Sequence, residues 1–100
     1  MSLSLGIFVC SDKHFEKVIK LCRAARKKGI EVRIFFTHEG ILLTQTPEFV
    51  ELEGFKMSVC KVGFEAHGLR PTVPGIGSKD YVTQAVHAEL IDECDRYVVF

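Results

Sequence analysis

The chain alternates between short apolar runs and segments whose apolar residues recur every three or four positions. Residues 5–10, 30–37, 57–60 and 96–100 form short runs rich in branched or aromatic side chains, which is typical of strands buried in a parallel sheet. Two prolines and two glycines make residues 71–77 at most a weak edge strand and loop. The pattern therefore predicts five strands.

Helices are predicted between these strands. The first begins at Ser11 or Asp12, ends before Gly29, and has one apolar stripe made by Phe15, Val18, Ile19, Cys22 and Ala25. Thr46-Pro47-Glu48 starts a second helix that stops near Gly54. Residues 61–67 form a short helix closed by Gly68. Residues 78–80 open the last helix, whose buried stripe is Val82, Ala85, Val86, Leu90 and Cys94.

Strands that alternate with helices define β-α-β units, whose crossovers are nearly always right-handed. We therefore predict one domain over residues 1–100, a three-layer α/β/α fold with a mostly parallel five-stranded sheet. Ligands of such folds bind at the carboxyl ends of the strands. The residues expected at that edge are Cys10, His14, His38, Glu39, Gly40, Cys60 and the loop 75–77.

The amino-acid composition limits the kinds of binding partner that are expected. The 100 residues include 13 basic and 13 acidic side chains, so no net charge favours nucleic acid or an anionic membrane. The apolar runs are shorter than the roughly 18 residues that a membrane span needs. The first residues have no basic region, and their apolar stretch stops at Asp12-Lys13, so no secretory signal is expected. These features predict a cytoplasmic protein without nucleic-acid or membrane partners.

Among the four cysteines, Cys60 has the most favourable position for chemistry. No C-x-x-C pair is present, and reduced thiols are the expectation for a cytoplasmic chain. Cys60 follows a strand and precedes a helix, where unpaired N–H groups, the helix dipole and Lys61 favour the thiolate. A small buried residue that fills the strand end is the alternative. Cys22 and Cys94 are expected to be packing residues.

The spacing of residues argues against two other classes of protein, a cysteine phosphatase and a receiver domain. A C-x5-R phosphatase loop needs arginine six residues after its cysteine, but Ala66 and Glu16 stand there. A receiver domain needs an aspartate where Cys10 and Cys60 lie. Cys10 could be a second active thiol, or could resolve an oxidised Cys60 if their strands are near neighbours. A buried structural thiol is the favoured interpretation of Cys10.

The histidines and glycines give weaker signals. No two histidines have the spacing of a metal pair on one helix, so no metal site is predicted. His38 or His14 could stabilise a thiolate or move a proton, whereas His87 is expected on the polar side of its helix. Gly75-Ile76-Gly77-Ser78 is similar to half of a phosphate-binding loop, although a turn that feeds a helix is the favoured interpretation.

Three segments together resemble the DsrE/DsrF-like family of small sulfur-relay proteins. These segments are residues 6–9 with 24–32, residues 34–40, and residues 59–69, which include the cysteine followed by a short helix and a glycine. The resemblance implies a sulfurtransferase-like fold in which Cys60 carries a persulfide. It also implies trimers or hexamers, sulfur donor and acceptor proteins as partners, and no cofactor, because persulfide exchange depends on the thiolate and its access alone.

Two other functions stay open beside a sulfur carrier. One is a non-catalytic oligomeric module that uses its cysteine only for packing. The other is a binder of small anions at the carboxyl edge, through Gly40 and the loop with Gly75 and Gly77. Homo-oligomers are expected in each case, since the edge near residues 71–77 and the last strand leave apolar surface for a partner.

Overall fold

A computed structural model describes residues 3–71 and 73–100. It contains a five-stranded sheet in the order β4-β3-β2-β1-β5, with every neighbouring pair parallel. The strands are β1 (Ser4–Val9), β2 (Glu31–Phe36), β3 (Lys56–Cys60), β4 (Tyr81–Val82) and β5 (Arg96–Val99). The predicted α/β class is confirmed, and the sheet is wholly parallel where a mostly parallel one was expected.

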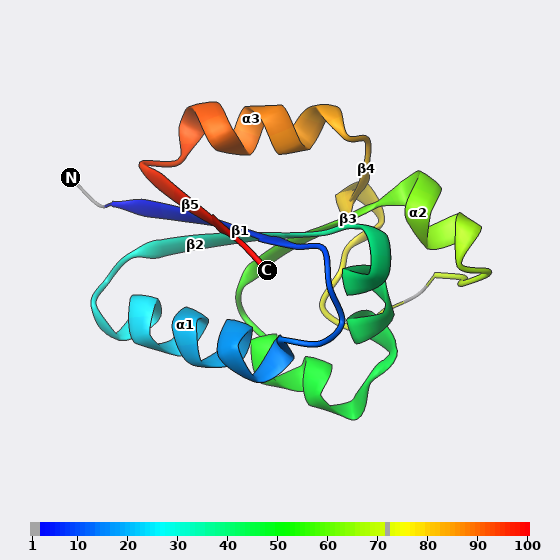
Figure 1. Cartoon of the computed structure of the whole chain (residues 1–100), viewed down its shortest axis with the longest axis horizontal. Coiled ribbons are helices and arrows are strands. Elements are labelled where there is room, and N and C mark those ends of the chain that lie inside the picture. Colours follow the sequence, from blue (N-terminus) through cyan, green and yellow to red (C-terminus); the bar gives the residue numbers. More distant parts are fainter. Residues whose placement is uncertain (1–2, 72) are drawn as a thin grey trace.

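Helices lie on both faces of the sheet (Figure 1). One face is covered by α1 (Phe15–Lys27) and by two 3-10 helices, η1 (His38–Gln45) and η2 (Pro47–Leu52). The other face carries α3 (Ala85–Glu93), and α2 (Lys61–Ala66) continues directly from the carboxyl end of β3. Within the described ranges, every helix is too short or too polar to cross a membrane.

Alternation along the strands divides the core between the two faces. Phe36 lies on the α1 side, where its ring centroid is 5.5 Å from that of Phe49 in η2. Phe8 lies on the α3 side, where its ring centroid is 4.2 Å from that of His87. The prediction of His87 on the polar side of its helix is therefore wrong. An imidazole can pack its flat ring on an aromatic side chain despite its polar nitrogens.

The region before α3 differs most from the prediction. The edge strand is Tyr81–Val82, not residues 71–77, of which residue 72 lies outside the described part. Residues 78–80 make one 3-10 turn, η3 (Ser78–Asp80), and α3 begins only at Ala85. Val82 therefore belongs to a strand. Of the predicted stripe, Leu90 and Cys94 are buried, because the rest of α3 covers the sheet only partly.

Two further boundaries differ because of local backbone bonds. The residue that caps α1 is His14, not Ser11 or Asp12, since the N–H groups of Cys10 and Ser11 both donate to the carbonyl of Phe100 and prolong the extended chain. The helix expected from Thr46 is the 3-10 helix η2, and η1 before it was not predicted.

Candidate functional site around Cys60

Cys60 is both the last residue of β3 and the N-cap of α2, as the sequence predicts. Its Sγ accepts a hydrogen bond from the backbone N–H of Gly63 at 3.4 Å. The residue is 6% exposed and borders an open depression of about 500 Å³. The other residues around this depression are Thr37, His38, Glu39, Val62, Gly63, Ala66, His67, Thr83 and Gln84.

Cys60 therefore combines a donor to its sulfur with a position at the border of an opening. A hydrogen bond from a backbone N–H stabilises negative charge on its acceptor. Lys61, which was expected to assist, borders a different depression together with Phe64 and Tyr81. The hydrogen-bond donor found next to the sulfur is thus a backbone N–H.

Gly63 lets α2 pack closely against η1. A Cβ atom at position 63 would lie 2.6 Å from Cδ1 of Ile41, which is nearer than Cβ atoms approach in real structures. The same Cβ would lie 3.7 Å from the Cys60 sulfur. A larger residue at position 63 would therefore require the end of the Ile41 side chain to shift.

His38 and His67 are brought together at the rim. His67 donates from Nε2 to the carbonyl oxygen of His38 at 3.0 Å, which joins the end of α2 to the start of η1. His38 is exposed and has φ of 50°, a left-handed conformation that few non-glycine residues adopt. Strained residues of this kind are held by the surrounding structure, often at functional sites. His38 was a predicted site residue, whereas His67 was not.

A hydrogen bond between distant segments closes another side of the depression. Gln84 donates from Nε2 to Oγ1 of Thr37 at 2.9 Å, and Thr37 is only 3% exposed. This contact holds the connection between β4 and α3 over the carboxyl end of β2. Sequence spacing gave no signal for it, because residues 37 and 84 belong to elements that meet only in the folded sheet.

Cys10 and His14 lie outside this depression. Strand β2 separates β1 from β3, so the ends of those two strands are about 9–10 Å apart. A disulfide needs Cα atoms within about 7 Å. The condition for Cys10 to resolve Cys60 is therefore not met. Cys10 is half-buried, which raises the pKa of its thiol, and His14 is an exposed residue before α1.

The remaining cysteines are enclosed by the core. Cys22 is fully buried in α1, and its burial raises the pKa of its thiol to about 12. Cys94 is also buried, and burial raises the pKa of its thiol as well. All four cysteines are free thiols. These two fit the expectation of packing residues.

The glycines that were predicted to contact a ligand have structural roles instead. The N–H of Gly40 donates to the carbonyls of Thr37 and Cys10, and a Cβ there would lie 2.0 Å from the oxygen of Val9. The N–H of Gly77 donates to the Asp80 carboxylate at 3.1 Å, so a negative group already occupies the place of an anion. Gly75 has φ of +93° and supports a turn. The geometry does not favour an anion-binding loop.

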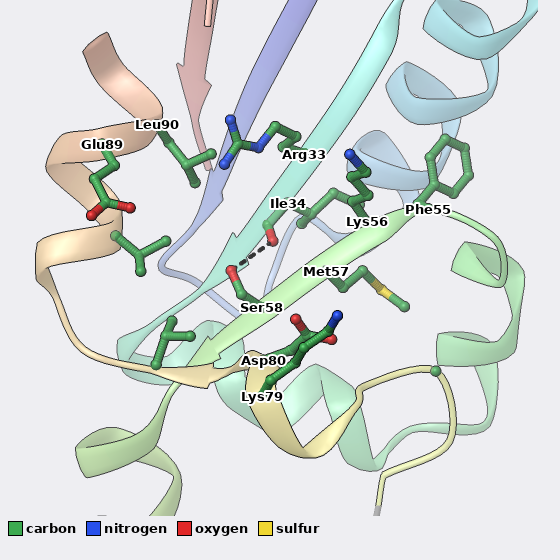
Figure 2. A pocket seen from close by; sticks show the side chains of 13 residues that line it. Arg33, Ile34, Phe55, Lys56, Met57, Ser58, Lys79, Asp80, Glu89 and Leu90 are labelled. Atoms are coloured by element: carbon green, nitrogen blue, oxygen red, sulfur yellow. Dashed lines mark hydrogen bonds between the residues drawn. The ribbon is translucent and has the colours of Figure 1, made fainter. Parts of the chain in front are cut away.

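A second depression, of about 510 Å³, lies beside α3 over β2 and β3 (Figure 2). Arg33, Lys56 and Ser58 project from the strands, while Lys79 and Asp80 approach from the loop before β4. Both strand cations are already paired: Arg33 with Glu93 at 2.6 Å and Lys56 with Glu31 at 3.3 Å. Ser58 donates to the carbonyl of Ile34 at 3.4 Å. No cysteine lines this depression, so the depression that Cys60 borders is the better candidate site.

Comparison with protein-family models, curated proteins and solved structures finds no match for the chain. Over residues 3–71 and 73–100, no three His, Cys, Asp or Glu side chains gather closely enough to hold a metal ion. The parallel sheet and the site geometry are therefore the basis for inferring a function.

Proposed function

We propose that the protein is a sulfur carrier, similar to the DsrE/DsrF-like relay proteins, that holds a persulfide on Cys60. The observation that carries the proposal is that Cys60 borders an open depression while its sulfur accepts a hydrogen bond from the Gly63 N–H. A carrier cysteine needs both features, because the thiolate is the nucleophile and both of its exchange partners are other molecules.

The chemistry needs only two sulfur exchanges. The Cys60 thiolate attacks the outer sulfur of a donor persulfide, a new S–S bond forms, and the donor leaves as a thiolate. An acceptor thiolate then attacks the outer sulfur on Cys60, and the Cys60 thiolate is released. Each exchange breaks one S–S bond and forms another, so no external oxidant or reductant takes part.

The surroundings of the depression suit this exchange. The extra sulfur would extend from Cys60 toward the rim formed by His38, His67 and Gln84, which supply polar groups without a buried carboxylate. The sulfur donor and the acceptor would be separate molecules, and proteins with exposed thiols are suitable for both tasks. A cytoplasmic location, where thiols stay reduced, also suits such a carrier.

The test is exposure of the purified protein to glutathione persulfide, followed by intact-mass and peptide mass spectrometry. We expect a gain of one sulfur atom on the peptide that contains Cys60, and loss of that gain in Cys60→Ser. Cys10→Ser keeps the gain and serves as the matched control, because Cys10 also ends a strand but lies outside the depression.

Transfer is tested by adding a small thiol to the persulfide form. Release of the extra sulfur, with return of the free Cys60 mass, is the expected result. Persulfide that forms on Cys10 instead, or a Cys60 that reacts no faster than a cysteine of the unfolded chain, would overturn the proposal. The second result would favour a non-catalytic module of the same fold.

A further inference from the structure

The outer edge of β5 has the features of a self-pairing surface. β5 is the last strand of the sheet, and its other side pairs with β1. The N–H of Phe100 donates to Phe8 at 2.8 Å and its carbonyl accepts from Cys10 at 2.7 Å, so Phe100 faces β1. Backbone N–H and C=O groups alternate in direction along a strand. Those of Tyr97 and Val99 therefore point away from β1, toward the open edge of the sheet.

The same two residues expose apolar side chains. Tyr97 is 52% and Val99 is 59% exposed. The ring centroid of Tyr97 is 5.8 Å from that of Phe8, so these side chains lie on the α3 face of the sheet. We define Tyr97 and Val99 as the edge patch.

The strand has few of the features that protect edges from pairing. Edge strands are usually protected by short length, charged side chains, proline, a bulge or a covering segment; β5 has four residues and one charged side chain, Arg96, but no lysine or proline. The opposite edge, β4, has only two residues, and a loop rich in proline and glycine precedes it. An added strand therefore has one suitable edge, which is β5.

We propose that a second copy of this chain docks on β5 to form a symmetric dimer with one continuous sheet. With antiparallel strands and the two-fold axis at Val98, Tyr97 of each copy lies opposite Val99 of the other. The outward backbone groups of these residues then exchange hydrogen bonds. Aromatic and β-branched side chains are favourable cross-strand partners on the same face. An isologous contact of this kind closes at two subunits, which differs from the trimers or hexamers that the family resemblance implies.

Charge complementarity also favours a second copy as the occupant. Arg96 is exposed at the start of β5, and its guanidinium bonds to the carbonyl of Asp95. Asp12 is exposed just beyond the end of β1. In the antiparallel dimer, the first residues of β5 in one copy lie beside the ends of β5 and β1 in the other copy. Arg96 of each copy thereby approaches Asp12 of the other.

The test is the mass of the full chain in solution, measured by light scattering and sedimentation at micromolar concentration. We expect twice the chain mass of 11.3 kDa. Val99→Lys should give the monomer mass, because it adds charge to the edge patch. Val50→Lys is the matched control, since Val50 is 65% exposed but belongs to η2 on the other face of the sheet, and it should leave the dimer intact.

Two more variants separate backbone pairing from a general loss of fold. Val99→Pro removes an outward N–H and should also give a monomer, with a far-ultraviolet circular dichroism spectrum like that of the unmodified protein. Arg96→Glu should weaken dimerisation several-fold, and Arg96→Glu with Asp12→Lys should restore it. A monomeric unmodified protein, or an assembly of any size that Val99→Lys leaves intact, overturns the proposal.

Discussion

Cys22 and Cys60 are both buried, yet their surroundings differ in kind. Cys22 is 0% exposed within α1, and burial raises the pKa of its thiol to about 12. Cys60 is 6% exposed, accepts a bond from the Gly63 N–H, and borders a depression. Exposed area distinguishes these residues poorly. What distinguishes Cys60 is a backbone donor to its sulfur and a position at the border of a depression.

Alkylation of the folded protein gives the largest contrast between the two thiols. A pKa near 12, against an ordinary value of 9.0, lowers the thiolate fraction of Cys22 about a thousandfold near neutral pH. Iodoacetamide at neutral pH should therefore modify Cys60 and leave Cys22 unmodified until the chain unfolds. Peptide mass spectrometry over time measures both rates, and equal rates would contradict this contrast.

Gly40→Ala should disrupt the packing of η1 against the end of β1. Its Cβ would lie 2.0 Å from the Val9 oxygen, so η1 must move away from the end of β1. We expect a loss of about 3 kcal/mol or more in the free energy of unfolding, measured by urea titration.

Gly29→Ala is the control for that substitution. Gly29 has φ of +75° with nothing within 4 Å of an added Cβ, so only conformational strain of about 1 kcal/mol is expected. Equal losses in the two variants would show that η1 is not held as described.

Alkaline pH should destabilise the folded protein in part through Cys22. Above pH 9.0 the unfolded chain releases the Cys22 proton, whereas the folded protein keeps it until about pH 12. The free energy of unfolding therefore falls as the pH rises through this window, by about 2 kcal/mol midway. Cys22→Ala is less stable at neutral pH but should lack this part of the alkaline loss. Urea titrations at several pH values measure the difference, and parallel curves would contradict it.

Gln84→Met should have the smallest effect on stability. It tests whether the bond to Thr37 restricts access to Cys60. It removes the hydrogen bond to buried Thr37 while keeping a side chain of similar length. We expect a loss of about 1 kcal/mol in the free energy of unfolding and faster alkylation of Cys60, because the β4–α3 connection is less firmly held. Unchanged stability and an unchanged rate would show that this bond does not restrict access to the sulfur.

The strands and the position of Cys60 could be predicted because they follow from local patterns. Each of β1, β2, β3 and β5 coincides with a short apolar run, and Cys60 stands directly between such a run and a short helix. β4 could not be found in this way, because a two-residue strand has no periodicity of its own. Its apolar residues fitted an extension of the following helix equally well.

The rest of the site depends on contacts between distant elements. The bonds between Gln84 and Thr37 and between His67 and His38 join segments that are far apart in the sequence. The left-handed backbone of His38 has no signal in its residue type, since turns of this kind favour glycine. His87 was misplaced because a histidine among polar neighbours gives no sign of the aromatic ring beneath it.

The bond from Gly63 to the Cys60 sulfur spans only three residues. It is therefore fixed by the local turn of the chain, whereas the rim of the depression comes from His38, Thr83 and Gln84 on other elements. For the proposed sulfur carrier, activation of the thiol and choice of partner would therefore depend on different residues. Substitutions at the rim could redirect which molecule reaches the sulfur while the turn that polarises it stays the same.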